Sequence, residues 1–281
     1  MANPIATNGT HNRQESYANS IVKLFRKQLV VRNEFMRDYE GNPTAGAVNV
    51  PVRAVDVALN NYDVVNGVSL TTSATTYLNI PVNNHKAINE LIDGYEASAV
   101  PDNLVAQRLE SGAYTIGTTL ELDAINELVD HGTTESSTTA LTEETAFKTI
   151  ATSIKDIKKL GVDLMDVVVI VSPETELLLQ TDTKFANTSG QLGAELVRDG
   201  VIGKIVGANT KMSANLPANV EYIVFAKPWA QAIDEWKIEP SVVNIMDDTH
   251  VGASKLAGRM VYADKLTNAL ACRVKTVPAS V

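Results

Sequence analysis

Two five-residue segments thirty residues apart, VNVPV at 48–52 and LNIPV at 78–82, are nearly the same. In both, apolar side chains alternate with Asn and Pro, which is the period of a strand with one buried face. No third copy follows at the same spacing, since residues 18–22 read NSIVK and residues 108–112 read RLESG. A solenoid is therefore excluded, and the pair predicts the two strands of one long hairpin.

The segment between the two strands is polar and rich in turn residues, which places the tip of the hairpin at about residues 60–74. After Val52 the alternation changes phase, which predicts a bulge or a bend. Pro51 and Pro81 cannot donate to a ladder, so we expect each to mark a free N–H side or the end of pairing near the base of the hairpin. A lone hairpin is marginal in water, and we expect this one to need support from outside its own chain.

Apolar residues at helical spacing predict three helices in the first half of the chain. The first covers residues 17–39, and the second covers residues 101–131, about 45 Å of rod at the usual rise per residue. The third covers residues 142–161, with Thr142 as its N-cap and two glutamates in its first turn.

A wholly apolar run, VVVIV at 167–171, predicts a buried strand. Ser172 and Pro173 follow it as an N-cap and a first helical residue, so a strand is joined to a capped helix in an α/β unit. Beyond it we expect a helix at about 191–198, a glycine-spaced stretch at 200–212, and strands at 222–226, 259–266 and 269–276.

Charge argues against a nucleic-acid reader, since Lys and Arg total 24 against 33 Asp and Glu and the net charge is −9. One basic cluster, KLFRKQLVVR at 23–32, could touch nucleic acid or an acidic neighbour, and a solvated helix face explains it equally well. The single cysteine, Cys272, lies in an apolar run and is expected to be a small buried side chain. No export signal or membrane span is recognisable, so we expect neither.

No residue pattern predicts catalysis. The segment GVIGKIVG at 200–207 lacks both the Ser or Thr that a Walker loop needs after Lys204 and the GxGxxG spacing of a dinucleotide site. The acidic cluster DDTH at 247–250 fits a solvated turn better than a metal site. None of the histidines has a partner at metal-ligand spacing: His11, His85, His131 and His250. We expect no enzyme, no cofactor and no metal.

Several motifs, in order, resemble the major capsid proteins of tailed bacteriophages, which have the Hong Kong 97-type fold. RDYEGNPTAGAVNVPV at 37–52 resembles the passage from the N-arm into the E-loop of these proteins. The segment from TTYLNIPV to DGYEA at 75–97 resembles the returning E-loop strand and its lead into the spine helix. VVVIVSPETELLLQ at 167–180, GKIVGANTKMSANLP at 203–217 and YIVFAKPWAQAI at 222–233 resemble the strands, helix and turn of the axial domain.

The resemblance covers about residues 15–277 and implies an α+β fold of the Hong Kong 97 type. Its parts would be an N-arm, an E-loop β-hairpin, a long spine helix, a peripheral domain and an α/β axial domain. The implied boundaries are 1–40 for the N-arm, 41–96 for the E-loop and its flanks, 97–141 for the spine helix and peripheral domain, 142–250 for the axial domain, 251–267 for a peripheral-domain strand, and 268–281 for the last axial strand and C-terminus.

The resemblance implies a coat protein that assembles into hexamers and pentamers of an icosahedral virion around double-stranded DNA, without sequence-specific binding. Assembly in the host cytoplasm, a separate scaffolding protein, a portal and a decoration protein are expected with it. The residues expected to contact neighbouring subunits lie at the N-arm junction and the hairpin tip: Arg37, Asp38, Tyr39, Glu40, Tyr62, Asp63, Val64 and Val65.

Some members of this family join their subunits by isopeptide bonds that start from an E-loop lysine, and this chain has no lysine from Gln28 through His85. The resemblance therefore implies a shell without that crosslink. Two other interpretations stay open. One is an encapsulin-like bacterial nanocompartment, which shares the fold but encloses protein. The other is an α/β enzyme with a site near 172–175 or 200–207.

Overall fold

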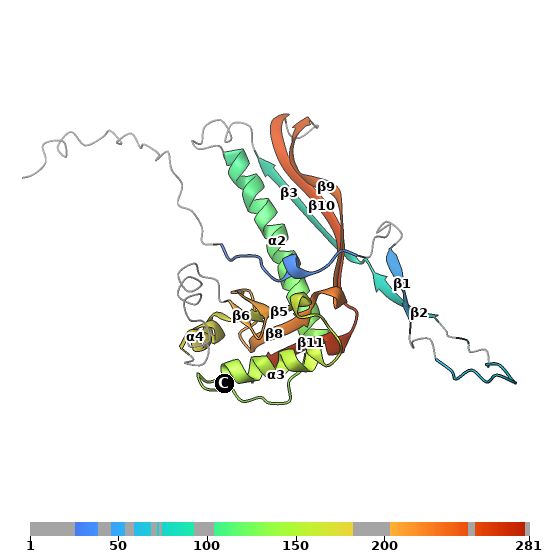
Figure 1. Cartoon of the computed structure of the whole chain (residues 1–281). Helices are drawn as coiled ribbons and strands as arrows, with labels where there is room; N and C mark the ends of the chain where they lie inside the picture. The colour runs from blue at the N-terminus through green and yellow to red at the C-terminus, as the bar shows by residue number, and fades with distance from the viewer. Residues whose placement is uncertain are drawn as a thin grey trace, which may run out of the picture.

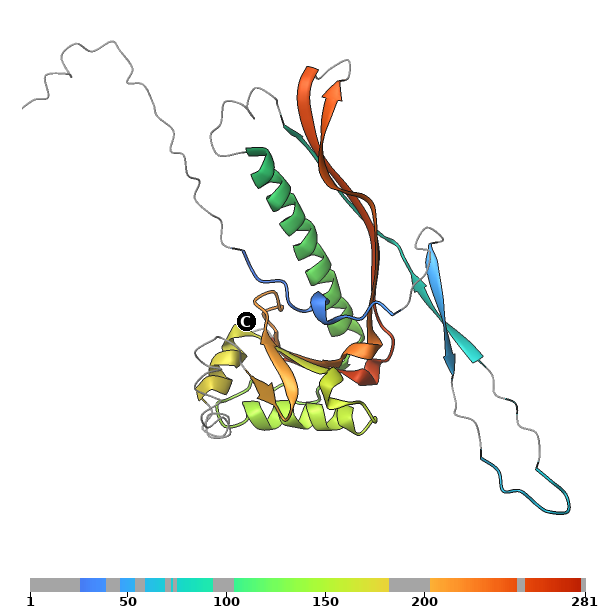
Figure 2. The same cartoon turned by 45° about the horizontal axis from the view of Figure 1, so that its top comes forward.

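The computed structural model describes residues 26–38, 46–53, 59–68, 72, 75–92, 104–181, 203–246 and 251–278. These residues form a mixed α+β fold in which one helix, α2 (Leu104–His131), runs from a three-stranded sheet at one end to a six-stranded sheet at the other (Figure 1). A two-stranded hairpin projects to the side, and Figure 2 shows that it extends well beyond the rest of the chain.

The six-stranded sheet is buried on both faces. Its strands, in spatial order, are β4 (Thr133–Thr134), β11 (Cys272–Thr276), β8 (Val220–Ala226), β5 (Val167–Val171), β7 (Ala208–Met212) and β6 (Lys204–Ile205). In central β5, Val167, Val169 and Val171 face one apolar cluster, which includes residues of α3 (Ala146–Lys158) and α4 (Pro173–Thr181). Val168 and Ile170 face a second cluster, with the C-terminal half of α2. Burial on both faces explains why this strand is apolar at every position.

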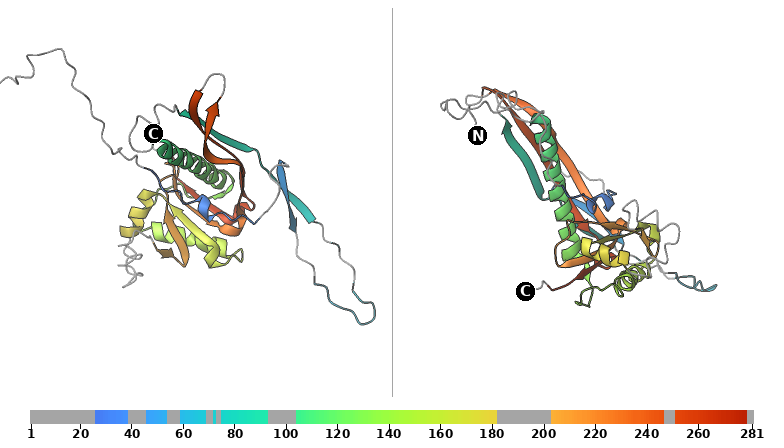
Figure 3. Two further views of the ribbon diagram at one scale, coloured as in Figure 1. Left: turned by 90° about the horizontal axis from the view of Figure 1, so that it is seen from above. Right: turned by 90° about the vertical axis from the view of Figure 1, so that its left-hand side faces the viewer.

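The three-stranded sheet has the order β3 (Asn84–Ile92), β10 (Val251–Leu266), β9 (Ala230–Met246), and both pairings are antiparallel. Its inner face packs against the middle of α2, where Met260 and Tyr262 meet Ile116 and Leu120. Seen from above and from the side, α2 lies along this sheet over most of its length (Figure 3). The helix therefore belongs to the cores of both sheets.

The predicted hairpin is confirmed as β1 (Ala47–Arg53) and β2 (Thr75–Pro81). The two similar pentapeptides pair with each other, with Val48 opposite Ile80 and Val50 opposite Leu78. Between these apolar pairs the Asn79 side-chain amide donates to Asn49 Oδ1 at 2.7 Å. The two segments are thus alike because similar residues pair with each other across the two strands.

The prolines do not both end the pairing. Pro81 pairs with Ala47 at the end of the ladder, whereas Pro51 pairs with Tyr77 inside it, so only Pro81 marks the end of the pairing. The Val82 N–H donates to the Gly46 carbonyl at 3.0 Å. Since hydrogen-bonded pairs alternate in an antiparallel ladder, both prolines occupy positions whose N–H would point outward. The ladder loses nothing there.

The hairpin has support within its own chain, which the sequence did not indicate. Its apolar face, with Val48, Val50 and Leu78, packs against Ile233 and Val261 on the outer face of the three-stranded sheet. The support comes from strands about 150 to 210 residues later in the chain, so no neighbouring helix in the sequence could indicate it. Residues 59–68 lie beyond the paired strands, and their large apolar side chains are exposed.

Two predicted helices differ from the structure. Residues 26–38 hold only a 3₁₀ turn, η2 (Arg32–Glu34), in place of the expected helix, and residues 17–25 and 39 lie outside the described residues. The third helix begins at Ala146 with Thr145 as N-cap, so Thr142 is not the N-cap. Instead, the Thr142 N–H donates to Thr145 Oγ1 at 3.0 Å in the turn before the helix. The second helix ends at His131 as predicted, and Ser172 caps α4, accepting the Thr175 N–H at 3.2 Å.

The strands of the second half are longer than expected. β10 starts at Val251 where the sequence predicted residue 259, and the long strand β9 was not predicted. β8 and β11 match their predictions closely, and Cys272 is buried, as expected. The helix expected at 191–198, the phase change after Val52 and the turn at 247–250 lie outside the described residues. Further 3₁₀ turns are η4 (Leu164–Asp166), η5 (Lys227–Trp229) and η6 (Ala269–Ala271).

Gly132 directly follows α2 and lies close to the six-stranded sheet, so a substitution there tests how closely the helix packs at this junction. A Cβ there would lie 2.4 Å from the Leu128 carbonyl oxygen and 2.8 Å from Cys272 Sγ. Because the nearest atom is backbone, we expect Gly132→Ala to lower the free energy of unfolding by about 1–3 kcal/mol in urea titrations. Asn126→Ala, at an exposed position of α2, is the control and should change it by less than about 0.5 kcal/mol. Equal stability of both variants would contradict close packing at this junction.

Candidate functional site

Residues 26–38 form an extended segment, here called the strap, that crosses α2 between the two sheets (Figure 1). The helix receives it on a stripe that includes Gly117 and Glu121. At Gly117 a Cβ would come within 2.6 Å of Leu29 Cδ1, so the missing side chain leaves room for the strap. Glu121, only 1% exposed, accepts the backbone N–H groups of Val30 and Val31 at 2.8 Å and of Arg32 at 3.0 Å.

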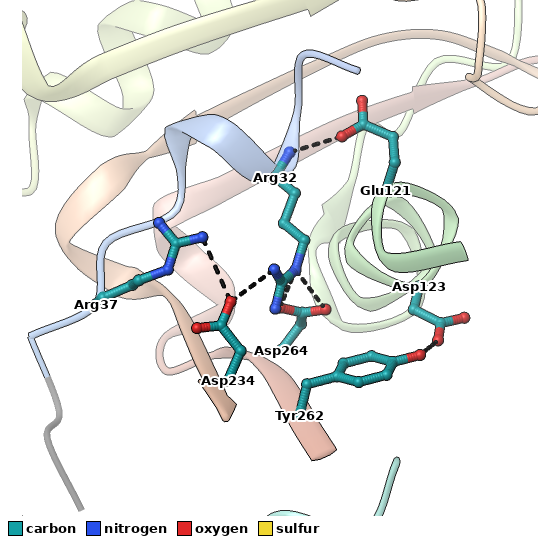
Figure 4. A network of polar contacts seen from close by, with 7 residues as sticks. All are labelled: Arg32, Arg37, Glu121, Asp123, Asp234, Tyr262 and Asp264. Atoms are coloured by element: carbon teal, nitrogen blue, oxygen red, sulfur yellow. Dashed lines mark hydrogen bonds and ion pairs between the residues drawn. The ribbon is translucent and has the colours of Figure 1, made fainter. Parts of the chain in front are cut away.

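Arg32 ties the strap to the three-stranded sheet (Figure 4). Its Nε lies 3.0 Å from Asp264 Oδ1 on β10, and its Nη1 lies 2.9 Å from Asp234 Oδ2 on β9. The guanidinium carbon is 5.7 Å from the centroid of the Tyr262 ring, a cation–π distance. Tyr262 in turn donates a hydrogen bond to Asp123 on α2. Strap, sheet and helix therefore meet at one polar cluster.

Burial dominates the electrostatics of this cluster. It raises the pKa of Asp264 to about 6, while Arg32 pulls that pKa down and the negative charges of Asp234 and Asp123 push it up. Burial also raises the pKa of the Tyr262 hydroxyl, as does its hydrogen bond to Asp123. Arg32 Nη2 is buried and has no hydrogen-bond partner among the described residues. The cluster joins three elements and sets their relative positions, at the cost of desolvating charges.

The rest of the strap is bound along its length. Glu34 pairs with Lys211 on β7 and, at 2.6 Å, with Lys227 in η5, and these lysines lower its pKa against the opposing effect of burial. Met36 forms a parallel bridge with Gln231, in which the Met36 N–H donates to the Ala230 carbonyl at 2.9 Å. The strap thus contacts both sheets as well as the helix.

The basic cluster at 23–32 has a use that the sequence did not indicate. Within its described part, Arg26 pairs with Glu110, Lys27 Nζ donates to the Ala214 carbonyl at 2.7 Å, and Arg32 is buried. These side chains bind their own chain. The signal that could have revealed it is Glu121, an acidic residue next to the predicted buried stripe of the second helix.

Two of the expected contact residues lie at the end of the strap and touch the chain's own β9. Arg37, about half exposed, reaches Asp234 Oδ2 at 3.5 Å. Asp38 exchanges hydrogen bonds with Gln231: its N–H donates to Gln231 Oε1 at 3.1 Å, and its carboxylate accepts from Gln231 Nε2 at 3.3 Å. Tyr39 and Glu40 lie outside the described residues.

The other four expected contact residues form a closed turn at the far end of the hairpin. The Asp63 N–H donates to the Gly67 carbonyl at 3.1 Å, and the Gly67 N–H donates back at 2.8 Å. Asp63 Oδ1 accepts the N–H groups of Val65 at 2.7 Å and Asn66 at 2.9 Å. The hydrogen bonds from Asn66 and then Val65 lower the pKa of Asp63. Gly67 has φ +72°, which a side chain would disfavour.

Large side chains of this turn point into solvent. Tyr62 is 73% exposed, Val64 89% and Val65 88%. Burying a Val or Tyr is favourable, and exposed apolar groups gathered on one element mark sites of interaction. Residues 59–68 are here called the hairpin tip, and they are a candidate docking element.

The sequence left two places open for an enzymatic site, and residues 172–175 and 203–207 of them are described. Ser172 and Thr175 are buried, and the Ser172 hydroxyl donates a hydrogen bond to Thr175 Oγ1 at 3.0 Å. Residues 203–207 form the start of the β6–β7 hairpin, where Val206 and Gly207 both have positive φ. A surface hollow of about 460 Å³ lies elsewhere, and its lining residues are Thr138, Ala218, Asn219, Thr276, Val277 and Pro278.

The described residues contain no group of three or more His, Cys, Asp or Glu side chains placed to hold a metal ion. Within the same part of the chain, no helix has the length and apolar character to cross a membrane.

Comparison with known proteins gives a match in structure and none in sequence. No protein-family model and no curated protein matches the chain. A structure of Mycobacterium phage Che8 is similar over 94% of this chain and 97% of that one, with TM-score 0.77 and 22% identity. The capsid structure of cyanophage P-SCSP1u covers 95% and 93%, with TM-score 0.76 and 13% identity. The capsid of a native GTA particle covers 99% and 100%, with TM-score 0.68 and 11% identity.

These likenesses extend over nearly the whole of both chains at identities too low for sequence comparison to detect. They show that the chain has the mixed α+β fold of phage capsid structures.

Asp264 gives the polar cluster a pH dependence that can be measured. Because its pKa rises from 3.8 to about 6 on folding, the folded protein holds a proton in a pH range where the unfolded chain releases it. Its contribution to stability is therefore complete below the unfolded pKa and is lost as the pH rises through the folded one. In urea titrations, we subtract the unfolding free energy of Asp264→Asn from that of wild type. This difference should fall by about 2 kcal/mol from pH 4 to pH 7.

Asn126→Ala is the control, because the position is exposed and has no titrating group. Its difference from wild type should not depend on pH. A difference between wild type and Asp264→Asn that stays constant or grows with pH would contradict the assignment.

Proposed function

We propose that this chain is the major capsid protein of a tailed bacteriophage and that it self-assembles into the hexamers and pentamers of an icosahedral head around double-stranded DNA. The observation that carries the proposal is the likeness to phage capsid structures over 94% or more of the chain. The match covers the projecting hairpin and the long helix together with the compact sheet, so it is a likeness of the whole architecture.

The parts of the Hong Kong 97-type fold can be assigned on this basis. The strap would end the N-arm, β1 and β2 with the hairpin tip would be the E-loop, and α2 would be the spine helix. The six-stranded sheet with α3 and α4 would form the axial domain. Because β9 pairs with β10 over most of its length, we assign residues 230–246 to the peripheral domain together with β3 and β10.

Subunit contacts would use the side chains that the chain's own core leaves free. Tyr62, Val64 and Val65 at the hairpin tip are the strongest candidates, since their exposure in one protomer is high. Arg37 would keep free donors for a neighbour, because about half of its side chain stays exposed after its contact with Asp234. Together with Asp38, Asp63, Tyr39 and Glu40 these residues form the proposed contact set.

A structural role without catalysis is part of the proposal. The buried state of Ser172 and Thr175 and the hairpin at 203–207 weigh against the enzyme alternative. The net charge of −9 suits a container that must not hold its DNA tightly. A scaffolding protein, a portal and a decoration protein remain proposed partners, the virion capsid the proposed location, and the host cytoplasm the proposed place of assembly.

Negative-stain microscopy of the purified protein tests the proposal directly. We expect closed shells hundreds of ångströms across, because the affinity is spread over many copies of each contact. Small compact oligomers alone, over a range of salt and protein concentration, would argue for the enzyme alternative. Particles purified from the cells that naturally make them should contain DNA, whereas protein cargo would favour the nanocompartment alternative.

The missing E-loop lysine predicts how these shells respond to denaturant. With no lysine from Gln28 through His85, an isopeptide bond cannot start from the hairpin. Boiled particles should therefore run on denaturing gels as a single band at 30 kDa, the mass of one chain. A ladder of covalent multimers would contradict this prediction, even if shells form.

A further inference from the structure

The hairpin tip, residues 59–68, is both exposed and internally bonded. It is highly exposed and apolar, yet its backbone is closed by the paired hydrogen bonds between Asp63 and Gly67 and by the Asp63 carboxylate. An exposed loop that had only to connect two strands would need neither the large apolar side chains nor this internal bonding.

We propose that Asp63 is a positioning residue that holds the hairpin tip as a preformed anchor, which presents Tyr62, Val64 and Val65 to a second copy of this chain. The inference rests on the proposed function and adds a mechanism to it. Asp63 acts on its neighbours in the turn, and the apolar side chains make the contact.

The geometry gives Asp63 this role. Its Oδ1 accepts the N–H groups of Val65 and Asn66, so it fixes the backbone on the far side of the turn, directly after Val64. Both N–H groups lie in an exposed turn, where water would otherwise compete for them and the backbone would sample other conformations. A loop already in its bound conformation loses less entropy on binding, and the gain appears as tighter association.

A second copy of the chain offers a surface that matches this anchor. On the outer face of the three-stranded sheet, Leu91, Lys255 and Val243 lie side by side across the three strands. Leu91 and Val243 are 50% and 45% exposed. Since residues on β10 alternate between the two faces of the sheet, Lys255 shares its face with Val261, which the chain's own hairpin already covers.

The same face continues toward the hairpin with Arg259 opposite Ile238, which is 51% exposed. The exposed apolar side chains of this face complement the exposed apolar side chains of the tip. The existing contact of Val48 and Val50 on this face shows that hairpin and sheet are compatible in chemistry. These features favour a second copy over an unrelated partner.

Two substitutions at Asp63 separate the positioning role from a direct charge contact. Asp63→Asn keeps an oxygen that can accept both N–H groups and removes the charge, whereas Asp63→Ala removes both. The matched control is Asn61→Ala, at an exposed position of the tip outside the closed turn. All are made in the full-length chain, and unfolding in urea confirms that the protomer remains equally stable.

The first measurement is amide hydrogen exchange in the unassembled protomer. The N–H groups of Val65 and Asn66 should exchange about tenfold faster in Asp63→Ala than in wild type, and within about twofold of wild type in Asp63→Asn. The second is the protein concentration at which half of the chain is in shells. We expect it to rise about tenfold in Asp63→Ala and less than about twofold in Asp63→Asn and Asn61→Ala.

Each other outcome is decisive. Equal weakening of assembly by Asp63→Ala and Asp63→Asn would mean that the carboxylate acts through its charge, and the positioning role would be wrong. Unchanged assembly in Asp63→Ala, from a wild type that forms shells, would overturn this inference and leave the proposed function intact. If wild type forms no shells, both fall.

Discussion

A carboxylate buried against three backbone N–H groups is the contact on which the arrangement of this protein depends. Glu121 would be costly to bury alone, and the strap satisfies it by turning Val30, Val31 and Arg32 toward it. That turn places the Arg32 side chain between β9 and β10. These contacts thus fix the helix, the strap and both sheets relative to one another. Substitution of a single member is unfavourable, because it leaves a buried charge unpaired.

Local sequence patterns predicted those elements in which the buried side chains recur at regular positions along the chain. The hairpin and β5 were found because their apolar residues follow the strand period or fill every position. β9 was missed because Asp234, Glu235 and Lys237 interrupt its pattern and Pro240 lies within it, at a register shift where an extra residue is accommodated. The strap has helical spacing, yet contacts with residues about 90 to 230 positions away hold it extended.

The candidate site could be predicted from the sequence only in part, and for different reasons. The exposure of Tyr62, Val64 and Val65 follows from their place in a polar, turn-rich segment, which the sequence shows. The cluster around Arg32 could not be predicted, since Asp234 and Asp264 stand in strands whose pairing the sequence did not reveal. Glu121 was visible as an acidic residue in a helix with a buried stripe, but its partners are main-chain groups, and these have no signature in the sequence.

The outward position of the two hairpin prolines limits how other chains can use this ribbon. A two-stranded ribbon has two free edges, and each edge invites another strand to pair with it. Pro51 interrupts one edge and Pro81 the other, each at a position where an N–H would have faced outward. Growth of the ribbon into a wider sheet or a fibril is therefore hindered on both sides. The projecting arm can make side-chain contacts at high local concentration without polymerising through its backbone.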